Sequence, residues 1–343
     1  MKSKSSEEIE HQLVHLFNGS EWPTYRYMFR HIEDKNPFVS ATIIAILNHC
    51  SIKNPDLLQC ILKCKRHLKT YQKKHQTYHW PFKKGYSLMP NSSFFGKLTP
   101  LALSPDADCS VLQQLALQNP LHIKALLNDL QFYRYDRRLF RLSHLQEPLS
   151  PHLQGSFLTW FPPKNQCTNL KMETVDIVVM SNILWFLGEV EQTTVSGYSE
   201  TSEAIIDMLY HPLLVKNPYR FSPYYPFLHH ILYAVSRMIV WGKNTYLVPH
   251  KEHIIRLAKQ IKITSSAEYL SIRSIEAFFQ TQFIKHNTSY EVFDKSPFYI
   301  LAFTEAFHSL EWISKQPTFQ IKFYSEALHY AMLRWLKEAT NEE

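Results

Sequence analysis

Long apolar stretches recur along this sequence, and each begins with a similar short polar signal. A Ser, Thr or Asn is followed by Pro or Val and then by ten or more mostly apolar residues. The stretches are NPFVSATIIAIL from Asn36, SPDADCSVLQQLAL from Ser104, TVDIVVMSNILWFLGEV from Thr174, SPYYPFLHHILYAVSRMIV from Ser222 and SPFYILAFTEAFHSL from Ser296. Ser, Thr and Asn accept hydrogen bonds from the free N–H groups of a helix start, and Pro fits the first turn. The pattern predicts buried helices, because their bodies carry few charges.

A second group of stretches has apolar residues at helical spacing and charged residues on the opposite face. They are NPDLLQCILKCKRHLKTYQKKH from Asn54, NPLHIKALLNDLQFY from Asn119, SETSEAIIDMLYHPLL from Ser199, HKEHIIRLAKQI from His250 and QIKFYSEALHYAMLRWLKE from Gln320. A further helix of mixed character, SSAEYLSIRSIEAFFQTQF, begins at Ser265. No segment alternates between apolar and polar residues over a sustained length, so strands should be few.

Buried and half-exposed helices therefore alternate along the chain. The buried helices begin 48 to 74 residues apart, which is too irregular for the short fixed repeat of an open helical solenoid. A closed ring fits better, with inner helices around a cavity and outer helices outside them. We predict an all-α fold, an α/α toroid of roughly five to six inner and outer helix pairs. The toroid domain would span 36–343, with N-terminal helices in 1–35 packing on it.

Two long connections, 75–103 and 134–173, are rich in aromatic residues and contain Pro. Each leads from an outer helix into an inner one, so in a toroid both would lie on the rim where the inner helices begin. Connections of this length are uncommon in compact domains unless they have a function. We expect that rim to hold the mouth of a cavity.

The composition narrows the class of protein. Among 343 residues only 7 are Gly, whereas Phe, Trp and Tyr together make up 14%. So few glycines argue against folds built on glycine-rich phosphate-binding turns, and neither GxGxxG nor GxxxxGK[ST] occurs. A nucleotide-loop enzyme is therefore disfavoured, and the aromatic content suits a helical protein with an aromatic-lined interior.

The 5 cysteines indicate neither a disulfide framework nor a metal site. Cys60 and Cys64 lie one helical turn apart, but no further ligands follow at zinc-like spacing, so we interpret them as part of a buried helix face. The N-terminus lacks the apolar core of a secretory signal, and no apolar run reaches the about 18 residues of a membrane span. We expect a cytoplasmic chain with free thiols, no membrane span, no metal and no cofactor.

The net charge of +7 is concentrated in KCKRHLKTYQKK, from Lys63 to Lys74, and in RYDRRLFR, from Arg134 to Arg141. Such runs can attract nucleic acid, diphosphates or anionic membrane surfaces. No nucleic-acid-binding motif accompanies them, so we interpret both as solvated helix faces and expect no specific nucleic-acid partner. Neither run identifies a protein partner.

Three acids at the starts of buried helices are the candidate catalytic residues. Asp106 and Asp108 lie two residues apart, and Asp176 holds the same place after its capping residue as Asp106 does. Acids in a first helical turn are stabilised by the helix dipole, by about 0.3–1 kcal/mol each, so all three could simply be caps. In a toroid they would also lie at the mouth of the cavity, where they could transfer protons. Both interpretations stay open at this point.

Polar or aromatic residues that interrupt the buried helices, or lie on the rim, are candidate substrate-binding residues. They are Trp160, Asn182, Tyr225, His229, Tyr233 and Arg237. The four from Tyr225 to Arg237 follow one another at four-residue steps, which places them on one helical face. Core packing explains each residue alone, but together they predict a polar-tipped aromatic pocket for an apolar small molecule.

The stretch SPDADCS resembles a motif of the class II cyclases, which belong to the terpenoid cyclase and protein prenyltransferase superfamily of α/α toroids. The motif reads D-x-D-D or D-x-D-T-[TS], and its middle Asp protonates an alkene or epoxide. The resemblance implies that Asp106 is the first Asp, Asp108 the proton donor and Ser110 the late Ser or Thr. Cys109 stands where the motif has Asp or Thr. The zinc ligands of protein prenyltransferases, whose β subunits are single toroids, are not matched.

The first of three functions that fit these residues is that of an enzyme acting on an apolar, isoprenoid-like substrate. Asp108, assisted by Asp106, would supply the acid. Tyr225 and Tyr233 would stabilise cationic character with their ring faces, and Arg237 would orient an anionic head group.

Two alternatives belong to other classes, so whether the chain is an enzyme stays open. A non-catalytic toroid would use its cavity for a ligand or its rim for a protein partner. A glycan-processing toroid would pair Asp108 with Asp176 or Glu189 across a glycosidic bond, and Trp80 and Trp160 would be platforms for sugars.

Overall fold

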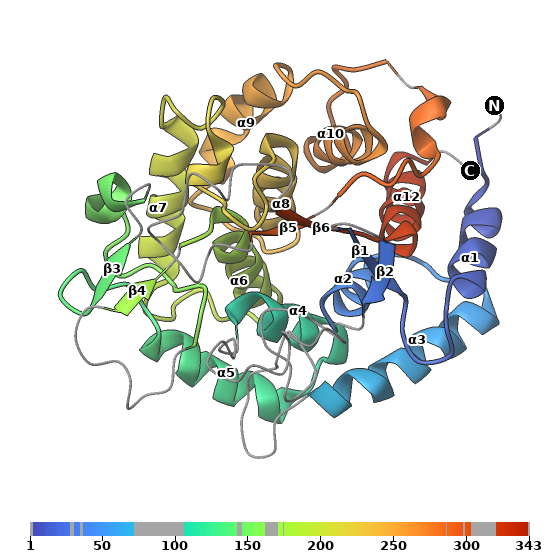
Figure 1. Cartoon of the computed structure of the whole chain (residues 1–343), viewed down its shortest axis with the longest axis horizontal. Helices are drawn as coiled ribbons and strands as arrows, with labels where there is room; N and C mark the ends of the chain where they lie inside the picture. The colour runs from blue at the N-terminus through green and yellow to red at the C-terminus, as the bar shows by residue number, and fades with distance from the viewer. Residues whose placement is uncertain are drawn as a thin grey trace. The chain divides into compact units, whose positions relative to one another are not determined.

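The computed structural model describes residues 3–27, 31–34, 37–71, 106–142, 146–161, 171–173, 175–285, 287–297, 299–302 and 320–341. These residues fall into two compact units (Figure 1). The first unit contains the described residues up to 71 and those from 261 onward, and the second contains those from 106 to 260. All the candidate catalytic and substrate-binding residues belong to the second unit.

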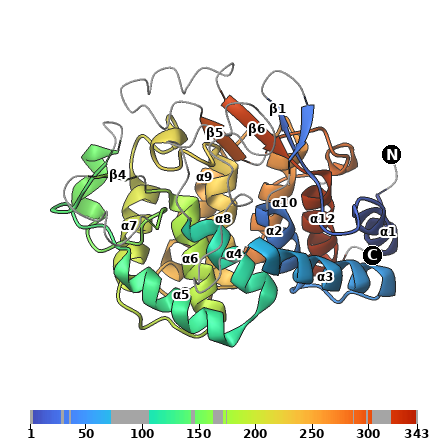
Figure 2. The ribbon, with the colours of Figure 1, turned by 60° about the horizontal axis from the view of Figure 1, so that its bottom comes forward.

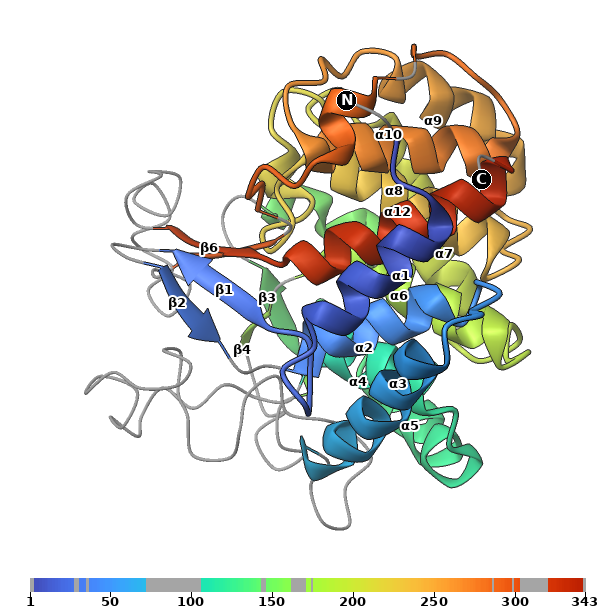
Figure 3. The same ribbon diagram turned by 90° about the vertical axis from the view of Figure 1, so that its right-hand side faces the viewer.

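Three of the helices described in the first unit pack against a fourth, the C-terminal helix α12. The described helices of this unit, in chain order, are α1 (Ser6–His15), α2 (Pro37–Leu47), α3 (Pro55–Leu68), α10 (Ser266–Phe279) and α12 (Glu326–Thr340). Helix α12 contacts α1, α2 and α10, and Figure 3 shows α1 beside it. Every residue of α2 is buried and none is charged, as the apolar stretch from Asn36 predicts.

The first unit also contains a four-stranded antiparallel sheet in the order β2-β1-β6-β5. Its strands are β1 (Thr24–Tyr27), β2 (His31–Asp34), β5 (Tyr299–Ala302) and β6 (Gln320–Tyr324). In its register Tyr25 of β1 lies opposite Glu33 on one side and Tyr324 on the other. The sheet thus joins the two ends of the chain that form this unit.

This sheet corrects two helix predictions. The helix expected from Ser296 contains β5, and the rest of that stretch, 303–310, lies outside the described residues. The helix expected from Gln320 begins as β6 and becomes helical at Glu326, after the N-cap Ser325. Both strands are rich in β-branched and aromatic residues, and their mutual pairing outweighs the helical spacing. The segment 1–35, expected to be helical, contains β1 and β2 as well as α1.

The helices described in the second unit form hairpins in which a buried helix precedes an amphipathic one. The hairpins are α4 (Ala107–Leu117) with α5 (Pro120–Phe132), α6 (Ile177–Glu189) with α7 (Tyr198–Tyr210), and α8 (Leu228–Val240) with α9 (Lys251–Ala258). Buried helix α6 contacts both α4 and α8 (Figure 2). The predicted alternation of buried and half-exposed helices is therefore present in this unit.

The remaining described elements are short. Strands β3 (Phe140–Leu142) and β4 (Lys171–Glu173) form a parallel pair. The 3-10 helices are η1 (Lys69–Tyr71), η4 (Glu147–His152), η6 (Pro218–Arg220), η7 (Val248–His250) and η8 (Thr288–Glu291). The predicted connection 75–103, with Trp80, lies outside the described residues. Within the described ranges, every helix is too short or too polar to cross a membrane.

Two glycines bring the C-terminal ends of α6 and α8 into close contact. A Cβ atom added to Gly188, in α6, would lie 1.8 Å from the carbonyl oxygen of Gly242, just after α8. The rings of Trp185 and Trp241 pack beside this contact, with their centroids 5.2 Å apart. Only glycine permits such a close backbone approach. The contact sets the relative height of α6 and α8, and therefore of the polar side chains that face one another between them.

Candidate functional site

Asp106 begins helix α4. Its carboxylate accepts a hydrogen bond from the backbone N–H of Cys109 at 2.5 Å, the bond of an N-cap residue. Its extended backbone forms a bridge with Trp160. The helix thus begins two residues later than the capping signal at Ser104 predicts. Asp106 serves as a cap, as one of the two interpretations of the sequence requires.

Asp108 lies in the first turn of α4, but its carboxylate bonds to other elements. The Nδ2 atom of Asn182, in α6, donates to Oδ1 of Asp108 at 2.6 Å. The hydroxyl of Tyr225, in the loop before α8, donates to Oδ2. The carboxylate of Asp108 therefore connects three segments that are far apart in the sequence, a role that capping does not explain.

Arg237 of α8 extends this network to a third helix. Its guanidinium donates to Oδ1 of Asn182. The guanidinium carbon lies 4.2 Å from the ring centroid of Trp185 and 5.0 Å from that of Tyr233, so the cation lies against two aromatic rings. A hydrogen-bonded series therefore runs from Asp108 in α4 through Asn182 in α6 to Arg237 in α8. We call these three residues and Tyr225 the acid network.

Burial governs the protonation of the two neighbouring acids. Desolvation, reinforced by the negative charge of Asp108, raises the pKa of Asp106 to about 7, although the bonds from Cys109 oppose the shift. Desolvation also raises the pKa of Asp108, against the hydrogen bonds from Tyr225 and Asn182 and the charge of Arg237. Both carboxyls therefore hold a proton at a higher pH than an exposed Asp does. Two acids so close together titrate as a coupled pair.

Asp176 is the N-cap of α6 and is fully occupied by structural bonds. It accepts from the backbone N–H groups of Val178 and Val179 at 2.8 and 3.3 Å. It also accepts from the Ser222 hydroxyl at 2.8 Å and from the Tyr224 N–H at 3.1 Å. Burial raises its pKa to about 7 in spite of these four donors. Asp176 thus fixes the loop that leads to Tyr225 onto the start of α6.

Small differences in exposure separate the acid network from its surroundings. Asp108 keeps 5% of its surface exposed and Tyr225 keeps 8%, whereas Asp176 keeps none. Leu112, one turn further along α4, is completely buried as well. The acid network is therefore part of the buried core of this unit and is only slightly more exposed than Asp176.

The predicted binding residues Trp160 and His229 interact with neighbours outside the acid network. The indole N–H of Trp160 donates to the Tyr224 hydroxyl at 2.9 Å, and its backbone forms a bridge with that of Asp106. The ring of His229 packs with those of Phe227 and His230, and desolvation lowers its pKa to about 3. His229 is therefore neutral at ordinary pH.

The predicted face of four residues is shorter than the sequence suggests. Helix α8 begins at Leu228, so Tyr225 lies in the preceding loop and reaches Asp108 from there. His229, Tyr233 and Arg237 do share a face of α8, as predicted. Trp185 was not selected from the sequence, although its place three residues after Asn182 puts it on the same side of α6.

No cluster of three or more His, Cys, Asp or Glu side chains suited to a metal ion occurs in the part of the chain that the structure describes. Cys109, beside the two acids, is buried, and burial together with the charges of Asp106 and Asp108 raises its thiol pKa well above the usual value. Cys109 is therefore a neutral, weakly polar neighbour of the acid pair rather than a thiolate.

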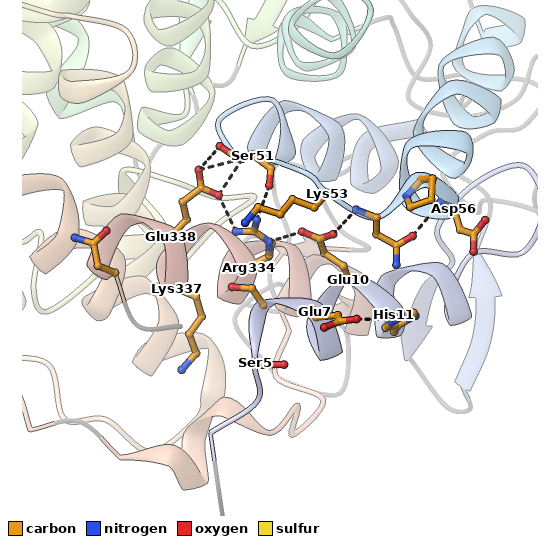
Figure 4. Close-up of a pocket in the computed structure, with 14 residues that line it drawn as sticks. Ser5, Glu7, Glu10, His11, Ser51, Lys53, Asp56, Arg334, Lys337 and Glu338 are labelled. Atoms are coloured by element: carbon orange, nitrogen blue, oxygen red, sulfur yellow. Dashed lines mark hydrogen bonds and ion pairs between the residues drawn. The ribbon is translucent and has the colours of Figure 1, made fainter.

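A concave region lies in the first unit, where α1, α12 and the segment before α3 meet (Figure 4). It has a volume of about 1080 Å³. Arg334 occupies its wall and binds Glu10 and Glu338, each at 2.8 Å, and the Ser51 carbonyl. Arg334 of α12 thus bonds to α1 and to the segment before α3, so the wall of this groove ties the chain's two ends together.

No family model matches the sequence, and neither does any curated protein. Solved structures do match. Type II terpene cyclase MstE from Scytonema, in its apo form, aligns with a TM-score of 0.57 at 8% identity over 98% of both chains. An arginine-to-alanine variant of MstE in complex with geranylgeranyl dihydroxybenzoate, described as its substrate, aligns with a TM-score of 0.52 at 9% identity, covering 98% of this chain and 97% of that one. An aspartate-to-alanine variant in complex with merosterolic acid A, described as the product, gives a TM-score of 0.50 at 9% identity with the same coverage.

Likeness at such low identity shows the fold alone. The chain has a terpene cyclase-like fold, and the predicted all-α class is confirmed. The number of helix pairs and the domain boundary at residue 36 stay predictions, as do the roles of the candidate residues.

Proposed function

We propose that this protein is an acid-catalysed cyclase of isoprenoid chains, with Asp108 as the proton donor. The bonding of Asp108 is the single observation that carries the proposal. A carboxyl group that only began a helix would bond to its own N–H groups, whereas that of Asp108 is held by Asn182 and Tyr225 from two other segments. Such fixed geometry is what proton delivery to one carbon of a substrate requires.

The electrostatics of the pair support an acid rather than a base. Asp106 titrates near pH 7, and burial raises the pKa of Asp108 as well, so a proton is available on the pair in neutral solution. In the proposed reaction the O–H bond of Asp108 breaks and a C–H bond forms at a terminal alkene. The resulting cation is attacked by the next double bonds, and a final C–H bond loses its proton. The lost proton passes to water, water returns a proton to Asp108, and the product is an isomer of the substrate.

Aromatic rings near the acid network would stabilise the cation. Tyr225 bonds to Asp108 through its hydroxyl, and Trp160 neighbours Asp106 through the backbone bridge, so both bring an electron-rich ring close to the acids. Tyr233 and Trp185 already cover the guanidinium of Arg237. Asp176, with four donors bonded to it, is a positioning residue in this proposal and transfers no proton.

The structural neighbours support the substrate class. MstE is described as a type II terpene cyclase, and its bound substrate contains a geranylgeranyl chain. We therefore infer that this chain takes a polyprenyl substrate of comparable kind.

Incubation in D₂O with polyprenyl probes tests the proposal. The probes are geranylgeraniol and geranylgeranyl dihydroxybenzoate, analysed by mass spectrometry for cyclic isomers. Delivery of the Asp108 proton, which exchanges with solvent, adds one deuterium to each product. The Asp108→Asn variant should lose turnover by 10²-fold or more, since general acids contribute about 10²–10⁴-fold. Cyclic product without deuterium, or equal turnover in the variant, would refute the proposal.

A non-catalytic ligand-binding protein is the second candidate, and the bonds of Asp108 also favour it. Both oxygens accept hydrogen bonds from the protein, which stabilises a static carboxylate. Binding of the same probes to both wild type and Asp108→Asn, without any product, would support this alternative. The glycan-processing alternative has less support, because Asp176 is fully bonded and Glu189 is exposed and bonded to Trp185.

A further inference from the structure

We infer that Arg237 is a positioning residue, which fixes the side-chain amide of Asn182 in the one orientation that lets it donate to Asp108. This inference rests on the proposed function only in taking Asp108 as the acid. Arg237 would then act on the acid through another side chain, without touching the substrate.

The chemistry of the amide carries the inference. An Asn side chain offers an acceptor oxygen at one end and a donor NH₂ group at the other, and either end can face a given neighbour. A guanidinium has only donors, so Arg237 can hydrogen-bond only to the oxygen end of the amide. The NH₂ end is then directed at Asp108, where it lies 2.6 Å from Oδ1. An ionised Asp108 also selects the NH₂ end, but a protonated Asp108 can donate to the oxygen end, so Arg237 is the group that keeps the orientation while the acid carries its proton.

Arg237 is itself held so that this orientation is lasting. Its side chain is 4% exposed and lies against the rings of Trp185 and Tyr233. Among the described residues it has no carboxylate within 4.0 Å, and its Nε atom has no hydrogen-bond partner. A buried cation without an ion pair is costly, so its retention calls for a role. Arg237 is connected to Asp108 through Asn182, and the positive charge of Arg237 offsets the negative charge of Asp108.

The groups facing Asp108 define what removal of Arg237 changes. On its own helix these are Asp106 and Cys109, the loop before α8 contributes Tyr225, and α8 contributes Arg237. Helix α6 contributes Asn182, which does not titrate. The charge of Arg237 and the Asn182 bond both lower the pKa of Asp108, so the loss of either raises it. If Arg237 also orients the amide, removing Arg237 already removes both contributions. Removing Asn182 as well should then raise the pKa of Asp108 little further.

Infrared titration of wild type and variants tests this without any substrate. The C=O band of the protonated Asp108 carboxyl is identified as the band lost in Asp108→Asn protein labelled with ¹³C-aspartate. Its titration midpoint is then measured in Arg237→Met, in Asn182→Leu and in the double variant. Both single variants should move the midpoint to higher pH. The double variant should match Arg237→Met, which already removes both the charge and the orientation of the amide, rather than add the two shifts. Arg256→Met, at an exposed arginine of α9, should leave it unchanged.

An unchanged midpoint in Arg237→Met, or additive shifts in the double variant, would overturn the inference. Arg237→Gln provides the same test if the Met variant does not fold. Glutamine stays polar at this buried position but carries both a donor and an acceptor and no charge, so it no longer selects the oxygen end of Asn182. The midpoint should again rise, and an unchanged one counts against the inference. On a turned-over probe, kcat should fall by about tenfold with little change in KM, as the loss of about 1.4 kcal/mol implies. The band decides the role of Arg237 even if no probe is cyclised, so the two proposals fail separately.

Discussion

The amide of Asn182 donates to Oδ1 of Asp108 over 2.6 Å, and this bond joins the middle of α6 to the first turn of α4. It separates two acids that look equivalent in the sequence. Asp106 accepts from its own helix and starts it, whereas Asp108 is bonded across the unit. The two Asp residues of SPDADCS therefore have different tasks, although they are only two positions apart.

Tyr225→Phe should make Asp108 a weaker acid that stays protonated to higher pH. The hydroxyl of Tyr225 donates to Oδ2 and lowers the pKa of Asp108, so its removal raises that pKa. The alkaline limb of kcat/KM against pH, measured on a cyclised probe, should move upward. Removing a buried hydrogen-bond donor should also cost about 1–3 kcal/mol of unfolding free energy.

The control for this variant is Tyr210→Phe, since Tyr210 is 50% exposed and its hydroxyl bonds to His250 far along the chain. It should reproduce the wild-type pH profile and stability. A Tyr225→Phe protein with an unshifted alkaline limb would show that this hydroxyl does not tune the acid.

The free energy of unfolding of the wild type should fall as the pH rises from 4 to 7, and Asp106→Asn should remove part of this fall. Asp106 has an ordinary pKa of 3.8 when unfolded and about 7 when folded, so the folded state binds the extra proton in that interval. Stability therefore falls as the pH rises through it and levels off above pH 7. Asn is an equally good N-cap and does not ionise, so the variant loses this slope.

The measurement is urea unfolding at a series of pH values from 4 to 8. Relative to the wild type, the free energy of unfolding of the variant should be a few kcal/mol higher at pH 8 than at pH 4, because one pKa unit corresponds to about 1.4 kcal/mol. Asp176 has a similarly raised pKa and keeps its share of the slope in both proteins. Identical slopes in wild type and variant would mean that Asp106 is not protonated in the folded state at neutral pH.

Asp176 should prove essential for stability and dispensable for proton transfer. Replacing it by Ala leaves two backbone N–H groups of α6, the Ser222 hydroxyl and the Tyr224 N–H without their acceptor. We expect a loss of about 3–5 kcal/mol, seen as a lower Tm, since each buried unpaired group costs about 1–3 kcal/mol. Asp207→Ala, at an exposed acid paired only with His152, should cost less than about 1 kcal/mol.

Asp176→Asn distinguishes the two roles. The Asn oxygen can still accept from the start of α6, so most of the fold and the turnover of a cyclised probe should survive. Loss of turnover in a variant that melts near the wild-type temperature would instead return Asp176 to the catalytic residues predicted from the sequence.

The sequence predicts the helices of the second unit well because their signals are local. Capping residues and apolar runs locate α4 and α6 to within a few residues, although the caps are Asp106 and Asp176 rather than the preceding Ser and Thr. The sequence predicts helix for β5 and β6, because each strand is stabilised by pairing with the other. Pairing between segments so far apart in the chain has no signal in the local sequence.

The candidate site was predicted as a set of residues but not as a network. Asn182 and Arg237 stand out because a polar residue in an apolar helix needs a partner. Nothing in their spacing says that they are partners of one another, since this depends on how α6 and α8 are rotated and raised relative to each other. Tyr225 was assigned to a helix and acts from a loop, because α8 begins only at Leu228.

Gly188→Ala should disturb the acid network from the far end of α6. The added Cβ would meet the backbone of Gly242 at 1.8 Å, so α6 and α8 must move apart. Overpacking of this kind costs about 1–3 kcal/mol and sometimes more. Asn182 and Arg237 lie between one and two turns before this contact, and the hydrogen bond between them should lengthen or break. The carboxyl band of Asp108 should then titrate at higher pH, as in Arg237→Met.

Ser181→Ala is the matched control, because it removes only a bond within α6 to the Ile177 carbonyl and adds no atoms. A Gly188→Ala protein that melts lower but keeps the wild-type midpoint would show that the helix contact supports the fold without setting the geometry of the acid.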